Sequence, residues 1–234
     1  MKGLGAVSNF DSPFYPYEKV YAYNGLKGAE NIPYKILVYL LDLPLSDGYV
    51  PVDDNARPRV RLAKYLWYDE PNPLSQALPT PAQKLSLLFD GEHPVIDTDD
   101  LKAAHPKGYR MYWQVFFGQS QTEAKTTLKC YMGRSYSPDG FHTRLGVTFE
   151  VLCNVNLETN TKTAAYARAY DIEQCIIEAL NGVNMAGVGT FELSRGHHGD
   201  NGSRPISDSG TNVGRELKMS LEWAEGNSET ITQW

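Results

Sequence analysis

The sequence predicts an α+β fold, in which a mainly antiparallel sheet carries one long amphipathic helix in the last third of the chain. Residues 145–157 and 217–223 alternate apolar and polar side chains, the period of a strand with one buried face. Between them, residues 161–182 repeat apolar side chains at spacings of three and four, the period of an amphipathic helix. The order strand, helix, strand, loop, strand indicates a helix packed on one face of a small sheet.

The helix predicted over 161–182 has a single apolar stripe. Its members are Ala165, Ala169, Ile172, Ile176 and Leu180. Burying each of the last three would contribute roughly 1.5–3 kcal/mol, so the helix is expected to lie on an apolar surface. Asn181-Gly182 should end it, because glycine can take the left-handed conformation that closes a helix. The helix dipole disfavours Glu178 near this end, so we expect a basic group from elsewhere in the chain, or from a neighbouring subunit, to offset its charge.

Three strands are predicted around this helix. The first buries one row of side chains, and the third buries another, with a shorter strand at 188–193 between helix and loop. The first row is Leu145, Val147, Phe149, Val151, Cys153, Val155 and Leu157, and the second is Leu217, Met219, Leu221 and Trp223. The three cysteines (Cys130, Cys153 and Cys175) fall within strand or helix patterns, which predicts reduced, half-buried thiols in a cytosolic setting.

The region from 31 to 142 is predicted to be β-rich. The apolar run 36–43 fits a buried strand, and 49–52 fits a returning edge strand because Pro51 lacks a ladder donor. Arg57, Arg59 and Arg61 recur at period two, so an extended chain would project them from one face. That face is either solvated, with local acidic partners such as Asp53 and Asp54, or a basic stripe for an acidic partner or DNA phosphates.

Further along, Thr80-Pro81-Ala82-Gln83 predicts the start of a short helix, with threonine as N-cap and glutamine three residues later. Residues 110–117 and 126–132 are predicted strands, and Pro138-Asp139-Gly140 a turn. A soft boundary near 136–142 then divides the chain, and the two parts on either side of it can still share one core. The predicted units are an arm (1–30), the β-rich region (31–142), the α+β core (143–225) and a tail (226–234).

Two segments are candidates for contacts with subunits or partners. The arm interleaves aromatic residues with glycine, proline and serine, so it either folds back on its own domain or anchors in a neighbour by its rings. The polar stretch 194–212 is predicted to be a long loop, a type of segment that tends to be functional. The candidate contact residues are Tyr15, Tyr17, Tyr21, Arg57, Arg59, Arg61, Arg195, His197, His198 and Arg204.

The composition is that of a globular chain, with 41% hydrophobic and 21% charged residues. The net charge of -6 argues against a general nucleic-acid binder, although an acidic surface could line a passage for DNA. No apolar run is long enough for a membrane span, and no signal peptide is expected. The sequence lacks recognisable catalytic or phosphate-binding motifs, so neither enzyme activity nor a cofactor is expected. His197, His198 and Asp200 are weak metal ligands, because nothing in such a loop fixes their angles.

The last third of the chain resembles the tail terminator proteins of tailed phages. The matching text, in order, is LGVTFEVLCNVN, TAAYARAYDIEQCIIEALNG, GVGTFEL and GRELKMSLEW. The resemblance implies a virion protein, assembled in the host cytoplasm, that forms a ring, commonly a hexamer. Such a ring caps the tail tube and docks to the connector on the head side, and DNA passes through its lumen without sequence-specific binding. The alternative is a β-sandwich carbohydrate-binding module or hydrolase, whose many aromatic side chains would stack on sugars.

Overall fold

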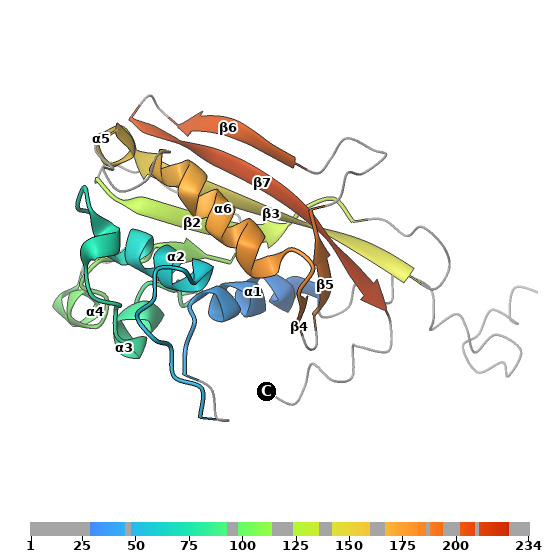
Figure 1. Ribbon diagram of the computed structural model, residues 1–234, viewed down its shortest axis with the longest axis horizontal. Helices are drawn as coiled ribbons and strands as arrows, with labels where there is room; N and C mark the ends of the chain where they lie inside the picture. The colour runs from blue at the N-terminus through green and yellow to red at the C-terminus, as the bar shows by residue number, and fades with distance from the viewer. Residues whose placement is uncertain are drawn as a thin grey trace, which may run out of the picture.

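The computed structural model describes residues 29–44, 48–92, 98–113, 124–135, 142–159, 167–185, 188–193, 202–208 and 211–224. Here one seven-stranded sheet carries helices on one face (Figure 1). The helices are α1 (Ile32–Leu40), α2 (Pro58–Trp67), α3 (Pro81–Leu85), α4 (Asp99–Ala104), α5 (Val155–Thr159) and α6 (Arg168–Leu180). The strands are β1 (Met111–Tyr112), β2 (Thr126–Met132), β3 (His142–Asn154), β4 (Asn184–Met185), β5 (Gly189–Glu192), β6 (Gly202–Asp208) and β7 (Asn212–Ala224). The fold is therefore α+β, as predicted.

Strand β7 organises the sheet. The strand order is β1-β2-β3-β7-β5-β4, and β6 also pairs with β7. One edge of β7 pairs with β3 over the full length of both strands, from Asn154↔Asn212 to His142↔Ala224. Its other edge is divided between β6, opposite 212–218, and β5, opposite 220–222. All pairings are antiparallel except that of β1 with β2.

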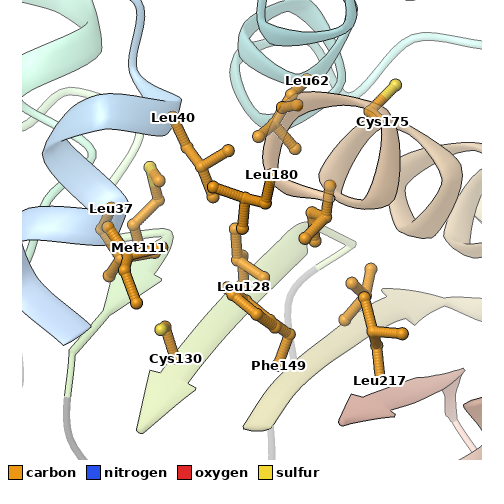
Figure 2. Packing of buried hydrophobic residues seen from close by; sticks show 14 of the residues in the cluster. Leu37, Leu40, Leu62, Met111, Leu128, Cys130, Phe149, Cys175, Leu180 and Leu217 are labelled. Carbon is orange, nitrogen blue, oxygen red and sulfur yellow. The ribbon is translucent and has the colours of Figure 1, made fainter. Parts of the chain in front are cut away.

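The core lies between α6 and the sheet, as the alternating pattern predicts. Ile172, Ile176 and Leu180 are fully buried. The inward residues that are at most 1% exposed are Leu145, Val147, Phe149, Val151 and Cys153 of β3 and Leu217, Met219 and Leu221 of β7. Figure 2 shows Leu180 with Leu40 of α1 and Leu62 of α2 on one side and Leu128 of β2 on the other. One cluster thus contains residues from both sides of the 136–142 segment. Cys130, Cys153 and Cys175 are buried free thiols within it, more completely enclosed than predicted.

Both ends of α6 are held by groups distant in the sequence or by special backbone geometry. At the C-terminus, Gly182 has a φ of 75°, the left-handed conformation predicted there. Arg61 Nη2 lies 2.6 Å from Glu178 Oε2, which supplies the expected offsetting charge from within the chain. At the N-terminus, Ala167 provides no side-chain cap, and the Ala169 N–H donates instead to Glu158 Oε2 at 2.9 Å.

The strand predictions for residues 36–43 and 49–52 are wrong. Residues 32–40 form α1, in which Ile32, Ile36, Leu37 and Leu40 all face the core. A helix buried on much of its circumference gives the same continuous apolar run as a buried strand, so periodicity over eight residues cannot separate the two. Residues 48–52 pair with no strand among the described residues.

Residues 57–62 are not extended, so the condition under which Arg57, Arg59 and Arg61 would project from one face is not met. Pro58 occupies the first turn of α2, where its missing N–H costs nothing, and Val60, Ala63 and Leu66 are buried at helical spacing. Within the described part of residues 31–142, only β1 and β2 are strands of the sheet before β3, whereas α1, α2, α3 and α4 are helices, so this part is not β-rich.

The remaining predictions are confirmed in part. Helix α6 covers 168–180 of the predicted 161–182, of which 161–166 lie outside the described residues. Thr80 and Gln83 form a capping box at the start of α3, and β2, β5 and β7 lie where strands are predicted. The first predicted strand runs to residue 157. In the structure, however, β3 ends at Asn154 and α5 follows it. In the strand predicted over 110–117, Met111–Tyr112 form β1, and residues 114–117 lie outside the described residues. The predicted turn at 138–140 also lies outside them. The loop predicted over 194–212 contains strand β6.

Candidate assembly surface

Strand β6 forms an edge of the sheet beyond the helices, at the top of the view in Figure 1. Pro205 and Ser207 lie opposite Arg215 and Val213 in register, so they share the helix-side face, whereas Arg204 points to the other face. All three of these β6 side chains are exposed. Pro205 cannot donate a ladder hydrogen bond, which weakens this edge as a template for indefinite strand addition.

An open groove of about 660 Å³ separates the β6–β7 hairpin from the start of α6. Its lining is mostly apolar and comprises Glu158, Ala167, Tyr170, Pro205, Ile206, Ser207, Val213, Gly214 and Arg215. Gly214 permits a close approach of β7 to β3 beneath this groove: a Cβ atom there would lie 1.8 Å from the Val151 carbonyl oxygen. A larger residue would force the two strands apart, so the groove depends on glycine at this position.

Arg215 holds one wall of the groove. It pairs with Glu173 of α6, donates to Ser203 Oγ, and its guanidinium lies 5.1 Å from the centroid of the Tyr170 ring. The Glu173 side chain is 1% exposed and that of Arg215 is 24% exposed, so the acid is buried and the base reaches solvent at the groove. Removing the base would leave a buried carboxylate without its counter-charge, which makes this pair a fixed part of the wall.

Sequence reasoning missed this pair. Glu173 is not a member of the predicted apolar stripe, and Arg215 precedes the strand predicted over 217–223. A signal was nevertheless present, because continuing the alternation of β7 backwards from Leu217 puts Arg215 in the buried row. A charged residue in an apolar register indicates a buried partner.

Glu158 closes the groove at the α5 end. Burial raises the pKa of its carboxyl above the ordinary value, and this outweighs the opposing effects of the Ala169 N–H and of nearby Arg168 and Arg215. Burial likewise raises the pKa of the adjacent Cys153 thiol to about 12. The thiol therefore stays protonated and unreactive at neutral pH.

The opposite face of the sheet carries a row of charges across four strands. Lys129 of β2, Glu150 of β3, Glu216 of β7 and Arg204 of β6 are successive neighbours in register. Lys129 Nζ lies 3.4 Å from Glu150, and Arg204 Nε lies 2.8 Å from Glu216. Burial alone would raise the pKa of Glu216, but the hydrogen bond from Arg204 and the charges of Lys218 and Arg204 lower it overall. This face is thus polar and internally compensated.

The arginines predicted as a basic stripe contact their own chain. Arg57 Nη1 donates to the Tyr49 hydroxyl at 3.0 Å, and Arg59 pairs with Asp42 at 2.8 Å. Arg61 pairs with Glu178, as described above. Asp53 pairs with Lys64 at 2.6 Å. The helix therefore does not bring the three arginines together on one exposed face.

Of the other candidate contact residues, the structure describes only Arg204. Tyr15, Tyr17, Tyr21, Arg195, His197 and His198 lie outside the described residues. Within the described ranges, no group of three or more His, Cys, Asp or Glu side chains could hold a metal ion. In the same ranges, no helix is both long and apolar enough to cross a membrane.

A second exposed apolar feature was not anticipated. Val50 is 65% exposed and Val52 is 59% exposed, whereas the intervening Pro51 and the preceding Tyr49 are half-buried. The Tyr49 hydroxyl donates to Asp42 Oδ1 at 3.0 Å, which fixes the inward side of this segment. The segment belongs to the long connection between α1 and α2, which reaches the bottom of the view in Figure 1, away from β6.

Comparison with protein families gives one informative match. The model of the family described as YomW matches residues 60–205, which run from α2 through Pro205 of β6. No curated protein and no solved structure matches the chain.

Proposed function

Because the chain belongs to the YomW family, a phage-derived family of the Bacillus type, we propose that it is a structural protein of the phage tail and neck. In this proposal, copies associate into a closed ring that ends the tail tube and docks to the head-side connector, and DNA passes through the lumen. The resemblance of residues 145–223 to tail terminator proteins supports this role, and the phage-related family is consistent with it.

The observation that carries the proposal is the exposed edge at β6 with its adjoining apolar groove. A strand exposed on both faces, beside a groove of about 660 Å³, is a surface suited to a protein partner. A contact between two different surfaces of identical subunits closes into a ring when the rotation between neighbours permits. The described residues form a single sheet with helices on one face, whereas the carbohydrate-binding alternative was argued for a β-sandwich.

The test is the oligomeric state of the purified protein, alone and with the tail tube protein of the same phage. Multi-angle light scattering should give a discrete multiple of the 26.2 kDa chain, and negative-stain microscopy should show rings that bind one end of the tubes. A protein that stays monomeric at high concentration, and that neither forms rings nor binds tube ends, would contradict the proposal.

A further inference from the structure

Helix α5 is a single turn, and one of its side chains holds the start of α6. A helix as short as five residues has little stability of its own, so contacts with the rest of the protein fix its position. It packs against α6, β3 and β7 at one end of the sheet (Figure 1). We propose that α5 is a pH-dependent latch, which stays closed while the Glu158 carboxyl is protonated and opens when that proton is lost.

The contact that closes the latch is the hydrogen bond from the Ala169 N–H to Glu158 Oε2, which is 2.9 Å long. Ala169 lies in the first turn of α6, where an N–H has no acceptor within the helix. Ala167, at the N-cap position, supplies no side-chain acceptor either. Glu158 therefore provides the acceptor that this N–H lacks, and a movement of α5 takes that acceptor away.

The groups around Glu158 come from each element that packs on α5. Arg168 faces it from α6, Arg215 from β7 and the Cys153 thiol from β3. The two positive charges favour the ionised carboxylate, but Arg215 already pairs with Glu173, and Arg168 donates to two backbone carbonyl oxygens. Burial outweighs the two charges, so the pKa of the Glu158 carboxyl lies above its ordinary value of 4.5.

Opening moves the Glu158 carboxyl into water, where its pKa returns to the ordinary value. The closed form therefore binds the proton more tightly than the open form does. The ratio of open to closed molecules rises with pH through the window between the two pKa values, and it is constant outside that window. Across the window the ratio rises by about tenfold for each pH unit that separates the two values.

Opening changes two places next to α5. Glu158 lines the groove beside β6, so its departure removes one wall of that groove. The buried Cys153 thiol interacts with the Glu158 carboxyl, so it loses one of the groups that shield it. An effect on subunit contacts rests on the proposed function, whereas the latch itself belongs to the single chain and is measured on it.

Hydrogen exchange tests the latch at its contact. The protection factor of the Ala169 amide, measured by NMR between about pH 4 and pH 8 and corrected for the intrinsic exchange rate, should fall through the window. Glu158→Gln keeps an acceptor and cannot ionise, so its Ala169 protection should stay constant. The Ile176 amide, in the middle of α6, should remain better protected than Ala169 at every pH, because it exchanges only when the helix unfolds.

Thiol accessibility separates a movement of α5 from a rotation of the Glu158 side chain alone. The reagent 4,4′-dithiodipyridine reacts with thiols in acid as well as at neutral pH, and trypsin places Cys130, Cys153 and Cys175 on three separate peptides. Labelling of Cys153, relative to the urea-unfolded chain at the same pH, should rise over the window in which Ala169 loses protection. Glu158→Gln should abolish this rise. Cys130 and Cys175 are the internal controls and should stay protected, since both are buried.

Loss of Ala169 protection without labelling of Cys153 would mean that the carboxylate rotates while α5 stays in place, which overturns the latch. Ala169 protection that is independent of pH, that falls equally in Glu158→Gln, or that equals the protection of Ile176 overturns it as well. None of these results bears on the ring, because neither measurement depends on assembly. Conversely, a protein that forms no ring but shows both changes keeps the latch and loses the proposed function.

Discussion

Strand β7 has a covered side and an open side, and the two differ in what they do for the protein. Towards β3, the sheet lies beneath α6, and Phe149, Val151 and Leu217 are at most 1% exposed. Towards β6, the sheet continues past the helix, and Arg204 and Pro205 are exposed. Free energy of folding is concentrated on the covered side, whereas the open side offers surface to a partner. Substitutions can therefore separate stability from assembly.

The largest effect is expected on the covered side. Ile176→Asp places a charge with no partner at a fully buried position of α6, which should cost more than about 4 kcal/mol and prevent folding. Circular dichroism and soluble yield measure the loss. Gln174→Asp, on a half-buried position of the same helix, is the control. A folded, soluble Ile176→Asp protein would show that this stripe does not face the sheet.

The next effect is at the contact between β7 and β3. Gly214→Val puts a Cβ in conflict with the Val151 carbonyl, so the strands must separate, at a cost of about 3 kcal/mol. Urea unfolding followed by tryptophan fluorescence measures it. Ser207→Val, in the same hairpin but exposed, should unfold like the native protein. Equal midpoints for the two variants would mean that the strands are not so closely apposed.

A smaller effect is expected at the groove wall. Glu173→Gln removes the buried partner of Arg215 and should cost about 2 kcal/mol, less than for a fully buried pair because Arg215 reaches solvent. In a double-mutant cycle with Arg215→Met, the double variant should be less destabilised than the sum of the single variants. Additive losses would indicate that the two side chains act independently.

The smallest effect depends on pH. The folded protein raises the pKa of Glu158, so it binds more protons than the unfolded chain between the ordinary value of 4.5 and the folded pKa. Stability is therefore lost as pH rises through this window, and the loss persists above it. Glu158→Gln mimics the protonated form and keeps an acceptor for the Ala169 N–H. It should melt above the native protein at pH 7 and match it near pH 4. A melting difference independent of pH would contradict this cause.

The sequence predicts the covered side of the sheet well because burial there falls on one face only. Alternation in β3 and β7 and the stripe of α6 each mark a single buried face, and a single period follows from that. In α1 the same reasoning fails, since burial over most of its surface removes the period. In β6 it fails for the opposite reason: exposure of both faces leaves serine, proline and glycine without any apolar alternation.

The candidate surface could not be assembled from the sequence, because its parts are far apart in the chain. The groove brings Glu158 and Tyr170 against Ile206 and Arg215. Arg168 gives a second example. It is not part of the predicted apolar stripe, yet it is fully buried and donates to the carbonyl oxygens of Tyr68 and Glu70, 100 and 98 residues earlier. Backbone acceptors at such separations leave no local pattern.

The shared pairing of β7 has a mechanical consequence. A force applied to β6 along its axis passes to β7 and then to β3, through a ladder that spans all thirteen residues of both strands. The ladder is then loaded in shear, so many backbone hydrogen bonds share the load and must rupture together rather than one after another. A subunit gripped at β6 would accordingly resist tension along its strands far better than a pull across them.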